Sequence, residues 1–425
     1  MNLTRILFLL FIPLAVTSAG YCQSTLRLMS YNILNFPSPE PVSRIDTLEK
    51  ILNYYRPHLF MIQELKASDG LSAITDMMDD LGYGSFAQCA YVPQQSSPGD
   101  AFTQQQAIVY DLNVLRLKSQ YEIITDVRDI NEYVMYLNDP ELESGADTVF
   151  LYVYVAHLKS STGTVNVNQR LAMVNDWRDY VEENVPPSSN VILAGDFNVY
   201  NNTEPAFMAL TEASSPLPLM DVFSSFGNWV GSGFAHKEIL TQSTRVNQLF
   251  GDGAGGGLDD RFDFMLFSES LLSGQQGLQY VENSFLSLGN NGTCYNQNLI
   301  DCDLGNDVPS DIIQALYYMS DHIPQVCELS MEIELQVTTH ARSSFNLSVS
   351  GDPFHTEYCL HSSKGAVELS LTDLSGREIT HWTLQSSAQM TCGNLPRVAA
   401  EGIYILRAAN KDGLHNVKRV VLGRQ

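Results

Sequence analysis

The stretch Asn190–Tyr200, NVILAGDFNVY, limits the fold of this chain more than any other segment. Its apolar run, Val191–Ala194, predicts a buried strand. Asp196 and Asn198 follow at the end of that strand, and residues two apart in an extended segment point to the same face. A carboxylate and a carboxamide therefore stand together at the carboxyl end of a strand, the edge where open α/β sheets bind ligands. A strand that ends in an Asx turn is the simpler interpretation.

The amino terminus has the features of a secretory signal. An apolar run from Ile6 to Val16 follows a single arginine, and small residues end at Ala19. The run is too short to anchor a helix in a bilayer, so we expect residues 1–23 to be a cleaved signal peptide and the mature chain to have no transmembrane segment. Cys22 allows a lipoprotein interpretation, which the bulky Tyr21 before it disfavours.

The seven cysteines suit an exported chain that forms some disulfides. Cys294 and Cys302 flank a loop rich in Gly, Asn and Asp and are the first candidate pair. Cys359 and Cys392, near the carboxyl terminus, are the second. Two of the others lie near apolar segments, where a free cysteine packs as a small apolar residue.

The chain carries 48 acidic and 24 basic residues, a formal net charge of −24. Such a charge repels a polyanionic substrate at long range, and no stretch has the basic pattern of a tight nucleic-acid binder. The same excess attracts divalent cations. An acidic surface that only keeps an exported protein soluble is the simpler interpretation.

Strand and helix patterns alternate along most of the chain. Apolar strands are predicted within 25–36, 57–65, 151–157, 191–196 and 261–272, and amphipathic helices within 43–56, 71–81 and 166–185. This alternation indicates an α/β protein in which helices pack on sheets. We expect one such domain over residues 24–336.

The pattern changes near the carboxyl terminus. Residues 337–344 are polar and read as a linker, and residues 345–425 form short alternating strands separated by turns such as Asp412-Gly413. This pattern predicts a small all-β sandwich.

Polar side chains stand at the ends of six predicted strands or in the adjoining loops. Each has a simple structural explanation as a cap, a turn or a buried histidine. Their recurrence at consecutive strand ends instead favours a common site, made of Asn32, Glu64, His157, Asp196 with Asn198, Asp263, and Asp321 with His322.

This set suits the metal-assisted hydrolysis of a phosphate ester. The hard oxygens of Asn32, Glu64 and Asp321 suit Mg²⁺ or Mn²⁺, with Ca²⁺ as a further alternative. The set lacks the clustered His or Cys of a catalytic zinc site.

The remaining polar residues have roles in the same chemistry. Asp196 orients or deprotonates the attacking water, and Asn198 donates to a phosphoryl oxygen. His322, held in one tautomer by Asp263, polarises the phosphate, with His157 acting from another side. Lys159 and Arg170 lie nearby in sequence and are candidate substrate-binding cations, although each also suits pairing with an acid.

These motifs resemble those of the endonuclease/exonuclease/phosphatase superfamily. They occur in the family's order between about residues 26 and 334, as SYNILNF, IQEL, VAHLKS, LAGDFNV, RFDFMLF and SDHIPQV. The resemblance implies a four-layer α/β/β/α sandwich with a divalent metal at Glu64 and the Asp263–His322 dyad opposite. Two departures stand out. Leu34 replaces an acidic residue that gives some members a second metal contact, and His58 replaces the usual Asp before the Glu64 strand.

The tail resembles the C-terminal sorting domain of the type IX secretion system, through LTDLSGREI, EGIYILRA and the closing NVKRVVL. The resemblance implies export across the outer membrane to the medium or the cell surface, with the secretion machinery as a partner. A sandwich that binds carbohydrate or protein is the alternative.

We therefore expect a secreted, monomeric, Mg²⁺-dependent phosphodiesterase, most simply an extracellular nuclease. A phosphatase or a sphingomyelin-type lipid phosphodiesterase is the alternative among enzymes, and the acidic charge keeps it open. A non-enzymatic binding protein on the same scaffold is the alternative from another class.

Overall fold

A computed structural model describes most of the chain. The described residues are 24–38, 44–96, 104–138, 148–223, 229, 235–303, 305, 308–331, 346–352, 355–361, 365–373, 377–386, 390–400, 402–410 and 415–423. The predicted signal peptide, 1–23, and the predicted linker, 337–344, lie outside them. The chain divides into two compact units, Met1–Ile333 and Glu334–Gln425, and each is described by itself.

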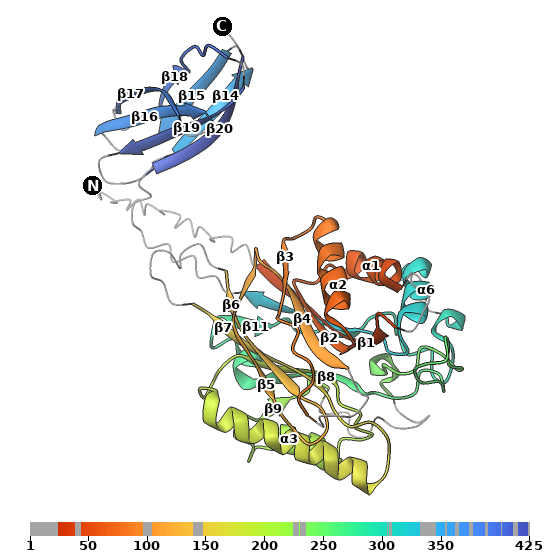
Figure 1. Ribbon diagram of the computed structural model, residues 1–425. Helices are drawn as coiled ribbons and strands as arrows, with labels where there is room; N and C mark the ends of the chain where they lie inside the picture. Colours follow the sequence, from red (N-terminus) through yellow and green to blue (C-terminus); the bar gives the residue numbers. More distant parts are fainter. Residues whose placement is uncertain are drawn as a thin grey trace, which may run out of the picture. The chain divides into compact units, whose positions relative to one another are not determined.

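The first unit contains two sheets (Figure 1). Sheet A has the order β11-β13-β1-β2-β4-β3, with β12 also paired to β13. In it, β1 and β2 are parallel and the other pairs antiparallel. The strands are β1 (Ser24–Phe36), β2 (Leu59–Leu65), β3 (Phe86–Gln88), β4 (Gln105–Asp111), β11 (Leu278–Tyr280), β12 (Leu286–Ser287) and β13 (Gln325–Met331).

Sheet B has the order β5-β6-β7-β8-β10-β9. Here β7 and β8 are parallel, and the other neighbours are antiparallel. The strands are β5 (Leu115–Ile123), β6 (Ile130–Leu137), β7 (Phe150–His157), β8 (Val191–Asp196), β9 (Leu219–Met220) and β10 (Asp263–Ser268).

Helices cover the outer faces of both sheets. On sheet A these are α1 (Arg44–Tyr55), α2 (Ser68–Asp80) and α6 (Ser310–Met319), and on sheet B α3 (Thr164–Asn184) and α4 (Pro205–Thr211) (Figure 1). A short α5 (Glu269–Ser273) and the 3₁₀ turns Lys237–Ile239 and Leu299–Asp301 complete the described helical elements. Among the described residues, no helix is both long and apolar enough to cross a membrane.

The two sheets pack face to face, with β1 and β2 against β7, β8 and β10. The apolar run of β8 is fully buried, as its sequence predicts. On the outer side of sheet B, Trp177 of α3 packs edge-on against Tyr154 of β7, with ring centroids 5.6 Å apart. The predicted four-layer α/β/β/α sandwich is thus confirmed.

The second unit is the predicted small all-β sandwich. One sheet contains β14 (Asn346–Asp352), β15 (His355–His361) and β18 (Met390–Asn394). The other has the order β17-β16-β19-β20, made of β16 (Gly365–Asp373), β17 (Glu378–Ser386), β19 (Gly402–Asn410) and β20 (His415–Leu422). Leu347, Leu360, Leu369 and Leu406 are fully buried in its core.

The structure forms two disulfides among its described residues, Cys294–Cys302 and Cys359–Cys392. The second joins residues that lie directly opposite each other on β15 and β18. Both match the candidate pairs from the sequence.

One predicted strand is shorter than its sequence pattern. The pattern within 261–272 predicts one strand, but β10 ends at Ser268 and residues Glu269–Ser273 form α5. The Ser268 side chain accepts the backbone N–H of Val191, and Gly274 ends the helix in the left-handed region at φ +76°. The left-handed glycine after the last turn is a local helix-end signal, while the Ser268 side chain bonds Val191 and does not cap the first turn of α5.

Candidate active site

The strand order brings the polar residues to one edge of the two sheets. Asn32 and Glu64 lie on the parallel strands β1 and β2, and His157 lies directly opposite Asp196 at the ends of the parallel strands β7 and β8. Because β10 and β13 run antiparallel to their neighbours, their amino ends reach the same edge. Asp263 begins β10 opposite Asp196, and Asp321 and His322 precede β13.

Local irregularities aim the side chains of sheet A. The register between β1 and β2 shifts after Asn32, and the register between β2 and β4 shifts between Ile62 and Leu65. Glu64 lies within the second shift at φ +61°. Irregular backbone of this kind redirects a side chain and is common at functional sites.

A glycine sets the spacing of the corresponding strands in sheet B. Gly195 has φ +138°, and a Cβ on it would lie 1.9 Å from the carbonyl oxygen of Ala156 on β7. No side chain fits there, so β7 and β8 approach closely next to His157 and Asp196.

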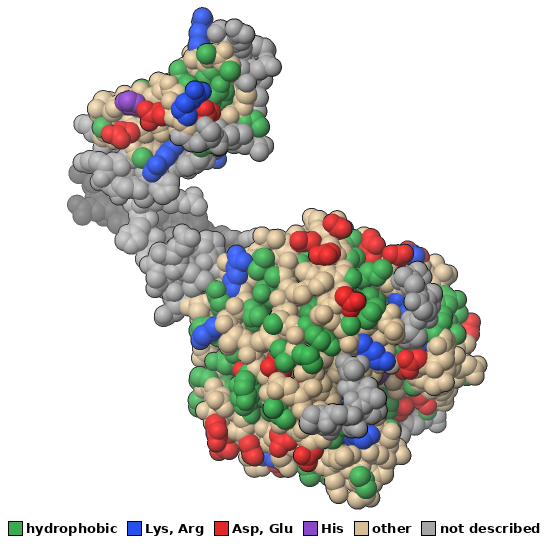
Figure 2. All heavy atoms as spheres, in the orientation of Figure 1, with side chains coloured by type: hydrophobic (Ala, Val, Ile, Leu, Met, Phe, Trp, Pro, Cys, Tyr) green, Lys and Arg blue, Asp and Glu red, His purple; other side chains and the backbone are tan. Residues whose placement is uncertain are grey.

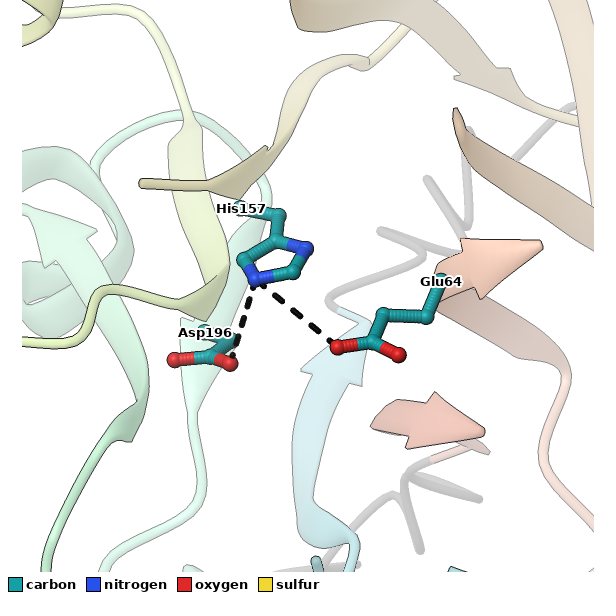
Figure 3. Close-up of side chains that lie close together, drawn as sticks. All are labelled: Glu64, His157 and Asp196. Carbon is teal, nitrogen blue, oxygen red and sulfur yellow. Dashed lines mark ion pairs between the residues drawn. The ribbon is translucent and has the colours of Figure 1, made fainter. Parts of the chain in front are cut away.

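Three side chains form the centre of the site. Glu64, His157 and Asp196 each offer a ligand atom, and these atoms lie within 4.8 Å of one another. His157 Nε2 lies 3.5 Å from Asp196 Oδ2 and 3.9 Å from Glu64 Oε1 (Figure 3). The Glu64 side chain is 12% exposed, against 4% for each of the other two, so solvent reaches the cluster past Glu64.

Both carboxyl groups of this cluster hold protons more tightly than usual. The pKa of Asp196 is raised to about 7, chiefly by burial, with the charges of Asp263 and Glu64 acting in the same direction and the charge of His322 opposing them. Burial, followed by the charge of Asp321, also raises the pKa of Glu64. Negative charge is therefore in excess, and a cation between these groups would relieve it.

A histidine–aspartate dyad faces the cluster. His322 Nδ1 lies 2.7 Å from Asp263 Oδ2, and its Nε2 points toward Asp196 Oδ2 at 3.7 Å. Burial alone would lower the pKa of His322, but the charges of Asp263 and Asp196 hold it well above its usual range. The imidazole of His322 is therefore more basic than that of a free histidine.

His157 differs from His322. Burial, followed by the charges of Arg128 and His322, lowers its pKa well below the usual range. The neutral imidazole thus presents Nε2 to Glu64 and Asp196 as a hydrogen-bond or ligand atom, not as a charge.

The two asparagines hold the carboxylates in place. Asn32 Nδ2 donates to Glu64 Oε1 at 3.0 Å and to Asp196 Oδ2 at 3.1 Å, while its Oδ1 accepts the backbone N–H of Leu34. Asn198 donates its backbone N–H to Asp196 Oδ1 at 3.1 Å. Its Nδ2 is 3.4 Å from the Leu158 carbonyl oxygen, so Asn198 lies on the sheet B side of the site.

Asp321 is tied to a glycine-rich segment, Gly251–Gly257. Its Oδ2 accepts the backbone N–H of Ala254 at 2.5 Å and the side chain of Gln242 at 3.3 Å. Its charge reaches Glu64, but the ligand atoms that cluster most closely are those of Glu64, His157 and Asp196. The assignment of Asp321 as a metal ligand stays a prediction.

The two candidate substrate-binding cations differ in their surroundings. Arg170 is fully buried, and its Nε pairs with Glu204 Oε1 at 2.5 Å. Its Nη1 donates to the carbonyl oxygens of Lys159 and Ser161, so Arg170 supports the turn after β7. Lys159 is half-buried, and its ammonium donates to the carbonyl oxygen of the neighbouring Ser160 at 3.0 Å.

No sequence motif identifies two further residues that lie near the centre of the site. Arg128 is buried, donates to the Leu158 carbonyl oxygen at 2.7 Å, and interacts electrostatically with Glu64 and Asp196. Gln242 lies 2.5 Å from His322 Nε2. Both come from irregular segments, and only the position of a lone arginine shortly before a strand could have drawn attention to Arg128.

Solved structures resemble the chain at low identity. The human nocturnin catalytic domain with bound sulfate is 16% identical, with 73% of this chain and 97% of that chain covered and a TM-score of 0.44. TDP2 of D. rerio complexed with a single-strand DNA product is 14% identical, with 72% and 99% covered and a TM-score of 0.46. ANGEL2, described as a 2′,3′-cyclic phosphatase, is 14% identical, with 73% and 96% covered and a TM-score of 0.46.

A search of curated proteins by sequence gave no match. The family model described as Endonuclease/Exonuclease/phosphatase family matches residues 29–322, which is more than half of the chain. The match begins in β1, just before Asn32, and ends at His322, so it spans every polar residue of the site described above. The chain therefore belongs to the Endonuclease/Exonuclease/phosphatase family.

Proposed function

We propose that this chain is an exported phosphodiesterase that depends on a divalent metal, and that it acts outside the cell as a nuclease. The observation that carries the proposal is the convergence of Glu64, His157, Asp196 and the Asp263–His322 dyad at one edge of the sandwich. A structural role does not require such an excess of buried negative charge.

The donor set fits a hard divalent cation. Glu64 and Asp196 offer carboxylate oxygens, and His157 offers a neutral imidazole nitrogen within the same 4.8 Å. Oxygen donors suit Mg²⁺, and an added imidazole is acceptable to Mn²⁺. Glu64, the most exposed of the three, would be the principal ligand, and the bound cation would neutralise charge that develops on the phosphoryl group.

The other residues act on water and substrate. Asp196 Oδ2 lies 3.5 Å from His157 Nε2 at the centre of the cluster, where its carboxylate is suited to orient the attacking water and accept its proton. His322, fixed by Asp263 and with a raised pKa, is suited to bind a proton and donate to a phosphoryl oxygen, and Arg128 adds a positive charge from the sheet B side. Asn198 supports Asp196 through its backbone N–H.

The test uses the purified chain from residue 24 onward with bis(p-nitrophenyl) phosphate, plasmid DNA and RNA. We expect turnover with Mg²⁺ or Mn²⁺ and none with EDTA. Asp196→Ala and His322→Ala should each remove it, while Asp179→Ala and His381→Ala, at exposed positions, should not. The absence of turnover on every phosphate ester with metal present would favour a binding protein on the same scaffold.

A phosphatase or a lipid phosphodiesterase is the second candidate, and the net charge of −24 favours it. On the face of the larger unit that Figure 2 draws, lysines and arginines lie apart from one another, and acidic side chains lie both near the edges and within the face. Long polyanions gain little from such a surface. Sphingomyelin and inositol phosphates therefore belong in the same assay, and faster turnover of these than of DNA or RNA would support this candidate.

We further propose that residues 1–23 direct export and that residues 345–425 are a sorting domain for type IX secretion. The sequence motifs support this role, and the two-sheet sandwich with its disulfide is compatible with an exported module. Residues 345–425 fused to a reporter with a signal peptide should reach the medium or surface of a host that has the machinery. Retention of the fusion in the periplasm would contradict the proposal.

A further inference from the structure

The side chain of Gln242 lies against the nitrogen of His322 that faces the site. Three groups surround His322 Nε2: Gln242 Nε2 at 2.5 Å, Asn32 Nδ2 at 3.4 Å and Asp196 Oδ2 at 3.7 Å. The contact with Gln242 is the shortest of the three. Gln242 lies in an irregular segment, outside the family's sequence motifs in this chain.

The backbone holds Gln242 in this position from two sides. Gln242 forms antiparallel bridges with both Asp260 and His322. Its N–H donates to the Asp260 carbonyl oxygen at 3.0 Å, and its own carbonyl accepts the N–H of Asp260 at 2.9 Å. On the other side, the Ile323 N–H donates to the Thr241 carbonyl oxygen at 2.9 Å. The carboxamide therefore extends from a fixed main chain.

The same carboxamide also contacts Asp321. Gln242 Nε2 is 3.3 Å from Asp321 Oδ2, which in turn accepts the N–H of Ala254. Gln242 thus joins the imidazole of His322 to the carboxylate that fixes the segment Gly251–Gly257. A carboxamide has both a donor and an acceptor, so it can pair with an imidazole nitrogen that accepts and, after rotation, with one that donates.

We propose that Gln242 is a positioning residue: its carboxamide holds the His322 ring over Asp196 and gives up Nε2 when a phosphoryl oxygen arrives. This inference rests on the proposed phosphodiesterase function. A small misplacement of a group that acts in the transition state can lower the rate by about 100-fold. The loss should appear in kcat, because the ring is oriented for the reaction and Gln242 is not the main substrate contact.

The experiment compares Gln242→Leu and Gln242→Glu with the wild-type chain on bis(p-nitrophenyl) phosphate and Mn²⁺. Leucine removes both hydrogen-bonding functions, and we expect kcat to fall by about 10- to 100-fold with KM within about threefold. Glutamate keeps the size but lacks the donor that contacts His322 Nε2 and Asp321 Oδ2, so its kcat should also fall below that of wild type. Gln297→Leu, at an exposed position, is the matched control and should keep both constants.

The outcomes separate the two proposals. An inactive wild-type chain overturns the proposed function and this inference together. An active wild type with an unchanged kcat in Gln242→Leu overturns the role of Gln242 alone, as does a loss that appears only in KM. If the leucine variant does not fold, the glutamate variant decides, and a wild-type kcat in that variant overturns the inference.

Discussion

Two kinds of buried charge occur in the first unit, and they are arranged in opposite ways. Away from the site, Arg261 and Asp221 form a two-pronged ion pair, with Nη1 and Nη2 at 2.7 and 2.9 Å from the carboxylate oxygens. The Arg261 guanidinium also packs against the rings of Phe223, Trp229 and Phe264, 4.3 Å from the centroid of the last. In this pair, each charge has its counter-charge.

At the site, carboxyl groups outnumber the cations that face them. Asp196 and Glu64 have raised pKa values because burial and neighbouring carboxylates disfavour their charge. In a matched pair such as Arg261–Asp221, the loss of one member leaves a buried charge without its partner, whereas an unmatched set of buried charges already costs stability. The two regions should therefore respond differently to the loss of one charge.

The largest expected effect is on activity. Asp196→Asn removes the group proposed to accept the proton of water, and kcat should fall by about 10²- to 10⁴-fold. Because the folded-state pKa of Asp196 is raised, its charge destabilises the fold above pH 7, so the midpoint of urea unfolding at pH 8 should stay equal or rise. Asp179→Asn, at an exposed position, is the control. A variant that keeps its activity would remove Asp196 from the mechanism.

The converse change should affect stability. Arg261→Met leaves Asp221 buried without its partner, which should cost about 3–5 kcal/mol of unfolding free energy. The folded fraction should keep its kcat. Denaturant unfolding gives the free energy of unfolding of this variant and of the double variant Arg261→Met/Asp221→Leu. The double variant should recover part of the stability that Arg261→Met loses. If Arg261→Met is as stable as wild type, the two regions do not differ in the way described above.

A divalent cation should partly balance the charge at the site. Mg²⁺ or Mn²⁺ at 100 times its dissociation constant should raise the free energy of unfolding by about 2.7 kcal/mol. Glu64→Gln should abolish the gain, whereas Glu212→Gln should not, since Glu212 forms a surface pair with Arg178. Thermal unfolding with metal and with EDTA checks this. If the metal still stabilises Glu64→Gln, the cation binds elsewhere.

The smallest expected effect concerns Asp260. Burial, followed by the charge of Asp259, raises its pKa to about 6. Its contribution to stability is therefore fully present below the unfolded pKa, near 4, and is lost as the pH rises through about 6. Asp260→Asn should be more stable than wild type at pH 8, on the order of 1 kcal/mol after solvent screening, and not at pH 4. If Asp260→Asn differs from wild type in stability by the same amount at pH 4 and pH 8, the difference comes from packing and not from the charge of Asp260.

The sequence predicts the parts of this site that lie on regular strands. A buried run followed by Asp196 and Asn198 defines a strand end by local pattern alone, and so do the runs before Glu64 and His157. The parallel pairing of β1 with β2 and of β7 with β8 then brings these ends together. Because each of these side chains is placed by its own strand, its position depends little on contacts with distant parts of the chain.

The parts that the sequence did not predict depend on non-local contacts. Gln242 approaches His322 only because its segment is bridged to Asp260 and to the residues before β13, about 80 positions later in the chain. Arg128 approaches Glu64 and Asp196 through a loop before β6. The pairing of Arg170 with Glu204 likewise joins α3 to the start of α4. Nothing in the local pattern around these residues encodes such partners.

Gly195 contributes no functional group to the site, yet its position does not tolerate a side chain. Any side chain there would collide with the carbonyl oxygen of Ala156 and separate β7 from β8. Since His157 and Asp196 are the next residues on those two strands, their separation is set by the missing side chain between them. The separation of these two side chains therefore depends on the absence of a Cβ at residue 195, and an alanine there would alter the geometry of the site without changing any of its polar groups.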